Sequence, residues 1–595
     1  MRRDPVPFHQ VDIQDSFWKQ RMDTLNRVTL PDCLNKCEQT GRIANFRRAA
    51  GWEEGSFQGI YFNDSDVYKV LEGVAYSLRT TPNPELEKWA DEIIAAICAA
   101  QQPDGYLNTY YTLGEPGKRW TDMEKHEMYC AGHLIEAAIA YYQATGKDVL
   151  MKAALRLADH IDRTFGPGKR HWVPGHEEIE LALMKLYRLT GEERYLRLAR
   201  FLLEERGYGH GRGAIWDNPH MGAAYTQDDE PVAAQRRVKG HAVRAMYLYS
   251  AMADAMALGS EADYMPALLA IHEHVTRKNM YLTGGIGSSA SNEGFTLDYD
   301  LPNDTAYCET CASVGMVYWN HRMNLLTGDG QYADILERSM YNGALAGYAL
   351  SGDQYLYANP LASAGDKHRS PWFGCSCCPT QLARFIPSIG GYVYAAQEDR
   401  ILVNLYICSR TTITLASGTV VLRQETDFPW DGRVRIRVEQ AQSPFTLSLR
   451  LPGWCHSFTL IKNGRAIPTK RSLGYLDLGS MAAGDEVVFT LDMAVRRIHA
   501  RPEVFADAGL VAFERGPLVY CAEETDQTIP WEEIHLDPLA PVHRAEGPFG
   551  AQALLVPDAL NRQVTLIPYC LWDNREPGCM AVWLPEAPVP EQLYY

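Results

Sequence analysis

The sequence predicts a multidomain α plus β protein, in which an N-terminal (α/α)6 toroid is followed by antiparallel β-sandwich domains. One observation is a helical-hairpin phrase that recurs between residues 65 and 345. Another is a change, after residue 392, to short stretches of alternating apolar and polar residues. A third is the length of 595 residues, which exceeds what one hydrophobic core can organise. We expect the toroid at 1–395, a β-sandwich at 396–500 and a second β-sandwich at 501–595.

Each repeat of the helical phrase begins with polar residues, continues as an apolar helix of about four turns, and breaks before a second, amphipathic helix. The five breaks lie at Thr80–Pro84, Thr145-Gly146, Thr190-Gly191, Gly259-Ser260 and Thr327-Gly328. Five hairpins, with helical sequence at both ends of the region, predict a closed ring of six hairpins. The helix starts of such a ring gather on one rim around a common pit. The residues that precede or open the apolar runs include His126, His176, His241 and Glu309.

The C-terminal part consists of stretches rich in Val, Ile, Thr and Leu, such as RILVNLYI, RVRIRVE and FTLSLRL. Such stretches are typical of antiparallel strands. Turn signals such as Asn463-Gly464 and Ala483-Gly484 separate them. Because titratable groups do not gather here as they do in the helical half, we expect a structural or assembly role for this part.

The charge and composition of the chain argue against some classes of binding partner. The chain has 57 Lys and Arg against 74 Asp and Glu, a formal charge of -17, which argues against nucleic acid and anionic membranes. A neutral substrate fits better, and the 33 Tyr and 13 Trp suit a sugar site. No apolar run follows the N-terminal arginines and no segment has eighteen uncharged apolar residues, so we expect a cytoplasmic protein. Its 14 cysteines lack disulfide-framework spacing and are expected to be free thiols.

A cluster of cysteines and a glutamate is the sharpest local feature. Cys375, Cys377 and the adjacent Cys378 form a three-thiol group, and Glu309 and Cys311 stand two residues apart at a helix entrance. One carboxylate and three thiolates make a tetrahedral set suited to Zn²⁺, and Ca²⁺ or Mg²⁺ would not select thiolates. Two other interpretations stay open: the cysteines are small buried apolar residues, or the zinc is purely structural.

Six phrases in this order resemble glycoside hydrolase family 127, the bacterial β-L-arabinofuranosidases. They are KHEMYCAGH at 125–133, GHEEIELALMKLYRLTG at 175–191, GHAVRAMYL at 240–248, TGGIGSS at 283–289, ETC at 309–311 and CCP at 377–379. The resemblance spans the helical half and continues more weakly through the β-rich remainder. It implies hydrolysis with retention of configuration through a glycosyl-cysteine intermediate.

The resemblance also implies the site residues. The zinc ligands would be Glu309, Cys311, Cys377 and Cys378, with Cys377 as nucleophile. The acid/base residue would be Glu293, which lies sixteen residues before the ligand glutamate. A retaining hydrolase needs one group that attacks the anomeric carbon and another that protonates the leaving oxygen and then activates water. From the sequence alone, Glu293 could equally be an exposed loop residue.

The resemblance extends to substrate-binding residues, which would be His126, His176, His241, Tyr357, Glu337 and Gln39. This chain departs from the family in Thr380-Gln381 after CCP and in the extra thiol of Cys375, which leaves the exact sugar open.

We expect an exo-acting enzyme that releases terminal β-L-arabinofuranose from oligosaccharides or glycoconjugates. Alternatives are a hydrolase of a related furanoside or modified pectic sugar, a sugar epimerase or lyase, and a sugar-binding protein with structural zinc. The zinc-linked cysteine pair disfavours the epimerase or lyase. A homodimer formed through the C-terminal β-domain is a further expectation from the family.

Overall fold

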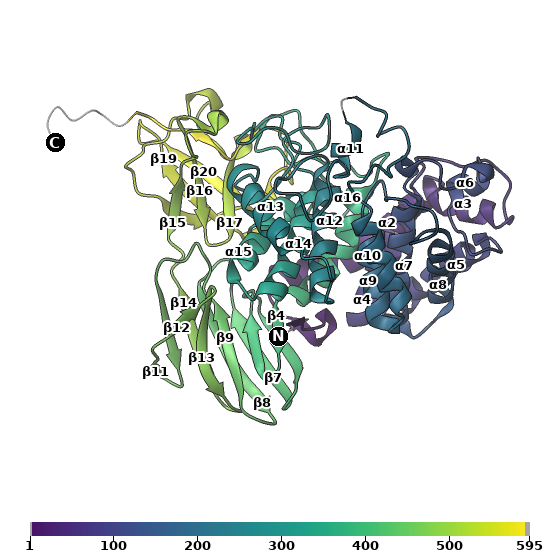
Figure 1. The fold of residues 1–595 in the computed structure, drawn as a ribbon. Helices are drawn as coiled ribbons and strands as arrows, with labels where there is room; N and C mark the ends of the chain where they lie inside the picture. Colours follow the sequence, from purple (N-terminus) through teal and green to yellow (C-terminus); the bar gives the residue numbers. More distant parts are fainter. Residues whose placement is uncertain (1–2, 220, 589–595) are drawn as a thin grey trace.

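The computed structural model describes residues 3–219 and 221–588, in which a helical half adjoins two β-rich regions (Figure 1). The chain runs through the helical half first and reaches the β-rich regions in the order that the sequence predicts. Within the described residues, no helix is long and apolar enough to cross a membrane.

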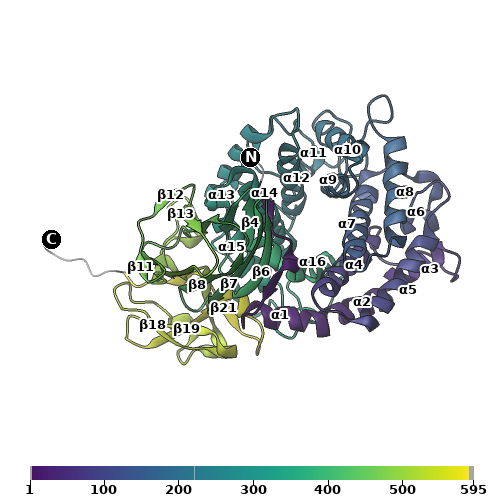
Figure 2. The ribbon, with the colours of Figure 1, turned by 90° about the horizontal axis from the view of Figure 1, so that it is seen from below.

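Six inner helices form a closed ring (Figure 2). They are α4 (Asp64–Thr80), α7 (Glu127–Thr145), α9 (Ile179–Thr190), α12 (Ala242–Ala257), α14 (Thr310–Thr327) and α16 (Cys377–Phe385). Each packs against the next in this order, and α16 packs back against α4. The predicted (α/α)6 ring is therefore confirmed, and the chain closes it by bringing a helix near residue 380 beside one near residue 70.

Outer helices complete the hairpins and begin at the predicted breaks or within five residues after them. They are α5 (Pro84–Ala100), α8 (Val149–Thr164), α10 (Glu193–Glu204), α13 (Met265–Lys278) and α15 (Gly330–Arg338). The sixth hairpin position is filled from the other end of the chain, because α2 (Leu30–Gln39) packs against α16. Further helices are α1 (Trp18–Thr24), α3 (Arg42–Ala49), α6 (Thr109–Leu113) and α11 (Gly222–Tyr225), with π-helical turns at Leu25–Thr29 and Ser339–Ala344.

Burial explains why the two rings of helices differ in sequence. Inner helix α7 is buried at every position from Glu127 to Tyr141, so it is apolar nearly all round. Outer helix α10 buries one face only and turns its charged residues to water. Gly146 ends α7 with φ 75°, a left-handed conformation that glycine adopts without strain.

A glycine also sets the closing contact of the ring. A Cβ atom added at Gly73 of α4 would lie 2.3 Å from the backbone oxygen of Ala383 in α16. Real Cβ atoms do not approach an oxygen that closely, so any larger residue here would force one of the two helices to shift. The missing side chain lets the backbones of α4 and α16 approach each other.

The middle region is a pair of facing sheets of six and seven strands, in the orders β1-β4-β5-β9-β13-β12 and β11-β10-β14-β8-β7-β6-β2. Their strands are β4 (Tyr394–Gln397), β5 (Arg400–Val403), β6 (Ser409–Leu415), β7 (Gly418–Thr426), β8 (Arg433–Ala441), β9 (Phe445–Arg450), β10 (Phe458–Lys462), β11 (Arg465–Ala466), β12 (Lys470–Ser472), β13 (Tyr475–Met481) and β14 (Glu486–Leu491). Strand β6 alternates buried and exposed residues along its whole length, as a half-buried strand should. The pairing is antiparallel except between β5 and β9.

The N-terminus belongs partly to this middle region. Strand β1 (Asp4–Pro5) pairs with β4, and β2 (Val11–Ile13) pairs with β6. The segment 4–13, which the sequence assigned to the toroid, thus supplies one strand to each sheet.

The C-terminal region forms a nine-stranded antiparallel arrangement. It contains β15 (Val495–Ile498), β16 (Leu510–Arg515), β17 (Leu518–Glu523), β18 (His543–Glu546), β19 (Gln552–Pro557), β20 (Gln563–Pro568), β21 (Cys579–Ala581) and β22 (Leu584–Pro585). Strand β3 (Ala362–Ala364) of the helical half pairs with β21. This pairing joins the C-terminal sheet to the segment just before α16.

The closing contact can be tested by overpacking it. We expect Gly73→Ala to cost about 1–3 kcal/mol of stability, because either α4 or α16 must shift. The measurement is the melting temperature by circular dichroism. The matched control is Gly117→Ala, whose added Cβ would have no described atom within 4 Å. Equal melting temperatures for both variants would contradict this account of the ring.

Candidate active site

The predicted cysteine and glutamate cluster assembles where two inner helices begin. Glu309 is the residue directly before α14 and Cys311 lies in the first turn of that helix, while Cys377 and Cys378 open α16. Because α14 and α16 are neighbours in the ring, their N-terminal ends meet on the same rim. One ligand atom from each of the four residues lies within 4.8 Å of all the others.

The distances within this cluster are short and converge on one carboxylate oxygen. Glu309 Oε1 lies 3.3 Å from Cys377 Sγ and 3.6 Å from Cys378 Sγ. Cys378 Sγ lies 3.5 Å from Cys311 Sγ and 3.9 Å from Cys377 Sγ. One oxygen and three sulfurs therefore surround a common centre.

The environment of the cluster fits a bound cation. Glu309, Cys311 and Cys378 are at most 3% exposed, and the second oxygen of Glu309 has no hydrogen-bond partner among the described residues. Burial, together with the neighbouring Cys377 sulfur, raises the pKa of Glu309 well above its ordinary value. Burial also raises the pKa of Cys378. Holding all four groups as anions is costly unless a cation compensates them, and three sulfurs with one oxygen suit Zn²⁺.

A cavity of about 210 Å³ opens beside the cluster. Cys377 lines it and is only half-buried, whereas Cys378 is fully buried and is not among the described residues that line the cavity. Of the two adjacent thiols, Cys377 is thus the one that a bound molecule can reach. Glu293 lines the same cavity.

Three donors surround the Glu293 carboxylate. Tyr307 donates from its hydroxyl over 2.8 Å, Tyr225 over 3.0 Å, and His241 Nε2 lies 3.4 Å away. Burial acts to raise the pKa of Glu293, but the contacts with His241, Tyr307 and Tyr225 outweigh it and lower this pKa below its ordinary value. Glu293 has φ 47°, and its backbone oxygen accepts from Ala242 at the start of α12. Neither tyrosine is predicted from the sequence. Tyr307 stands two residues before Glu309, a spacing that could have indicated it, whereas Tyr225 lies in the short helix α11 and has no comparable signal.

The three predicted histidines form a row along the cavity wall. Their ring centroids are separated by 5.6 Å from His126 to His176 and by 5.7 Å from His176 to His241. Nδ1 of His126 contacts the Glu124 carbonyl, and Nδ1 of His176 lies 2.8 Å from the Glu177 carbonyl. A carbonyl only accepts, so in both rings Nδ1 carries the proton and Nε2 is an acceptor.

His241 has the opposite tautomer. Its Nδ1 accepts from the backbone N–H of Val243 over 3.1 Å and thereby caps α12. The proton is then on Nε2, which faces Glu293. The row presents two acceptors and one donor.

Comparison with known proteins identifies one enzyme family over most of the chain. The family model described as "Beta-L-arabinofuranosidase, GH127 catalytic domain" matches residues 10–391. The models of the middle and C-terminal domains of the same family match residues 400–493 and 495–585. The chain belongs to glycoside hydrolase family 127. The resemblance predicted from the sequence is confirmed.

Relatives of this family 127 chain resemble it over most of their length. A curated non-reducing end β-L-arabinofuranosidase of Bifidobacterium longum subsp. longum is 39% identical over 573 residues, covering 87% of this chain and 86% of the relative. A solved GH127 β-L-arabinofuranosidase from Geobacillus stearothermophilus T6 is 41% identical, with a TM-score of 0.92 over 97% of this chain and 100% of that one. A second solved GH127 β-arabinofuranosidase is 40% identical, with a TM-score of 0.92 over 98% of each chain.

Of the other residues predicted to bind substrate, Tyr357 lines the cavity that contains Cys377 and Glu293. Its hydroxyl is 3.0 Å from Cys377 Sγ and 3.6 Å from Cys375 Sγ, and all three residues line the cavity. Cys375 is thus a neighbour of the nucleophile candidate, but it lies outside the group of four converging ligands.

The structure does not bring Glu337 or Gln39 to the cavity, since neither is among its described lining residues. Glu337 is buried where α15 meets the middle region, paired with Arg450 and accepting from Trp454 Nε1 over 3.0 Å. Gln39 is exposed at the last residue of α2. Glu337 therefore connects the ring to the middle region.

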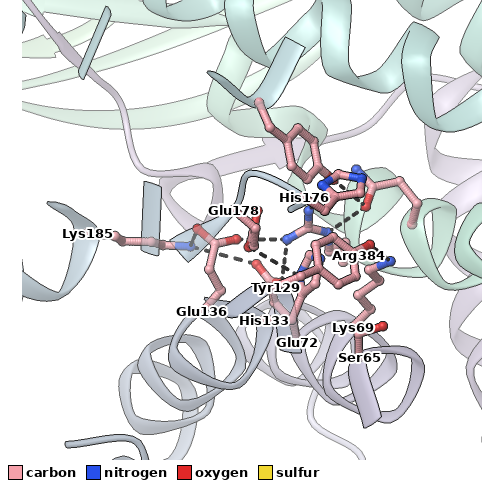
Figure 3. A network of polar contacts seen from close by, with 12 residues as sticks. Ser65, Lys69, Glu72, Tyr129, His133, Glu136, His176, Glu178, Lys185 and Arg384 are labelled. Atoms are coloured by element: carbon pink, nitrogen blue, oxygen red, sulfur yellow. Dashed lines mark hydrogen bonds and ion pairs between the residues drawn. The ribbon is translucent and has the colours of Figure 1, made fainter. Parts of the chain in front are cut away.

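A polar network lies next to His176 of the histidine row (Figure 3). Lys69 Nζ donates to the Tyr129 hydroxyl over 2.6 Å, and both residues are buried. The Tyr129 ring packs 4.4 Å from the centroids of both His176 and His133. Tyr129 of α7 therefore links Lys69 of α4 to His176 in the cavity wall.

Arg384 anchors α16 in the same network (Figure 3). Its Nη1 donates to Glu72 of α4 over 2.9 Å and to Glu136 of α7 over 2.8 Å. Its Nη2 donates to the Tyr247 hydroxyl of α12 over 3.0 Å. Arg384 follows Cys377 by seven residues, so these contacts hold the helix that carries the thiols.

Removing this guanidinium should destabilise the ring. We expect Arg384→Met to cost up to about 3–5 kcal/mol, because buried Glu72 and Glu136 lose one of the two cations that they share, and the other, Lys185, is partly exposed. The measurement is again the melting temperature. The control Arg501→Met removes an exposed pair with Glu503 and should leave it unchanged. If both variants melt at the same temperature as the wild type, Arg384 is not an anchor.

Proposed function

We propose that this family 127 chain is a retaining, exo-acting β-L-arabinofuranosidase in which Cys377 is the nucleophile and Glu293 the acid/base. The observation that carries the proposal is the half-buried Cys377 thiol in the same small cavity as the hydrogen-bonded Glu293 carboxylate. The curated relative is a non-reducing end β-L-arabinofuranosidase, which supports the choice of sugar.

In the first step Cys377 Sγ attacks the anomeric carbon, and the leaving oxygen takes its proton from the Glu293 carboxyl group. In the second step Glu293 removes a proton from water, whose oxygen attacks the same carbon and displaces the sulfur. Two inversions give net retention. Because its donors favour ionised Glu293, the carboxylate is ready for the second step. The first step requires a protonated carboxyl, so we expect substrate binding to loosen a donor.

The residues that would hold Zn²⁺ are Glu309, Cys311, Cys377 and Cys378. A bound zinc ion supplies one chemical effect here, which is to keep the Cys377 sulfur deprotonated near neutral pH. The N-terminal ends of α14, at Thr310, and of α16, at Cys377, favour anionic sulfur in the same direction, because a helix carries partial positive charge at its N-terminus.

The cavity supports exo action on a single terminal sugar. Its volume of about 210 Å³ is below the roughly 300 Å³ at which pockets for drug-sized ligands begin. His126 and His176 would accept hydrogen bonds from sugar hydroxyls through Nε2, and Tyr357 would donate beside the nucleophile.

The departures from the family leave these cavity contacts intact. Thr380 and Gln381 are fully buried, and the described lining of the cavity does not include them. Thr380 donates to the Ser376 carbonyl, and Gln381 accepts from Arg384. Both residues stabilise α16. Of the three departing residues, Cys375 is the one that lines the described part of the cavity, where it could alter the fit of the sugar. The predicted homodimer and cytoplasmic location stay predictions.

The nucleophile can be identified by intact mass after incubation with an activated β-L-arabinofuranoside. We expect a pentosyl adduct on Cys377 that persists longer in Glu293→Ala, because the second step loses its base, and that is absent in Cys377→Ser. The matched variant Cys375→Ser should still form the adduct on Cys377. An adduct on another residue would refute the assignment, and no adduct with no sugar released would refute the proposed substrate.

The metal set can be tested by zinc content. We expect Cys378→Ser to lose the zinc ion of this site, because one of three sulfur ligands is replaced by a weakly binding hydroxyl. Elemental analysis after dialysis measures the zinc per chain. The control is Cys308→Ser, a buried thiol next to Glu309 that is outside the cluster and should keep the ion. Equal zinc in both variants would contradict the ligand set.

A further inference from the structure

A second group of potential metal ligands lies on the outside of the ring. His171 is in the connection between α8 and α9, Glu205 follows the last residue of α10, and His210 lies five residues further along the chain. One ligand atom from each residue lies within 4.8 Å of the other two. These three residues, the outer triad, share no member with the thiol cluster.

The donor atoms of the outer triad converge on one carboxylate oxygen. Glu205 Oε2 lies 2.7 Å from His171 Nδ1 and 3.0 Å from His210 Nε2. The two imidazole rings stack with their centroids 5.0 Å apart and 27° between their planes. Ligands bound to zinc at about 2.0–2.1 Å are separated by about 3.0–3.4 Å, so small side-chain movements would seat an ion.

We infer that the outer triad binds a divalent transition-metal ion such as Zn²⁺, Co²⁺ or Ni²⁺. Two imidazole nitrogens and one carboxylate oxygen are a ligand set for these ions, whereas Ca²⁺ and Mg²⁺ prefer oxygen alone. The side chains of His171, Glu205 and His210 are 51%, 16% and 30% exposed, so water can complete the coordination. The site therefore has an entry path from solvent.

An ion here would join two segments that reach the active site. His171 lies five residues before His176 of the histidine row. The segment that contains His210 leads to Tyr225, which donates to Glu293. Gly207, which precedes His210, and Trp216, which follows it, both donate to Asp228, from the backbone N over 2.7 Å and from Nε1 over 2.9 Å. The ion would thus restrain the connection that positions one of the donors to Glu293.

The test is isothermal titration of the metal-free full-length protein with Zn²⁺, followed by elemental analysis of the loaded protein. Relative to the wild type, the double variant His171→Ala/His210→Ala should bind one equivalent fewer. The ion that remains should bind with an affinity within about two-fold of the wild type, because the sites are separate. Glu205→Gln, which can keep hydrogen bonds to both rings but loses the anionic ligand, should also lose this equivalent.

The matched control is His499→Ala, because His499 pairs with Glu586 over 2.9 Å on the surface as a single histidine and carboxylate. It should leave the stoichiometry unchanged. Co²⁺ separates the two sites, since the intense absorption of thiolate-bound cobalt should persist in the double variant and disappear in Cys378→Ser. Equal stoichiometry in the wild type and the double variant would overturn the inference. That outcome is independent of whether the thiol cluster binds zinc.

Discussion

The contact that closes the ring is the constraint on which the active site depends. Helix α16 comes from near residue 380 and packs between α4 and α14, and Gly73 lets its backbone approach α4. Because α14 and α16 then start on the same rim, Glu309 and Cys377 meet although 68 residues separate them. A change in the position of α16 would move two of the four ligands relative to the other two.

The helical ring contains two groups of buried charged residues, the Arg384 network and the thiol cluster. In the Arg384 network, Arg384 and Lys185 compensate Glu72 and Glu136, so these carboxylates are paired within the protein. At the rim, Glu309 has the sulfur atoms of the thiol cluster as neighbours, and the described residues form no ion pair with its carboxylate. The difference explains why the Arg384 network stabilises the fold by itself, whereas the thiol cluster is suited to an added cation.

Hydrogen-bond direction gives the cavity its polarity. His126 and His176 use Nδ1 on backbone carbonyls and turn acceptors toward the cavity, while His241 uses Nδ1 to cap α12 and turns a donor toward Glu293. The local backbone therefore fixes each tautomer before any ligand binds. Similar residues at equivalent helix starts thus take different roles.

The helical hairpins, the change to β structure and the residues of the thiol cluster could be predicted from the order of the amino acids, because periodicity, turn signals and motif spacing are local properties. Tertiary structure alone decided that segment 4–13 joins the middle sheets, that Tyr225 and Tyr307 hold Glu293, and that Glu337 pairs with Arg450 away from the cavity. These outcomes depend on contacts between residues far apart in the chain. A helix pattern shows which face is buried, but only packing shows which partner that face meets.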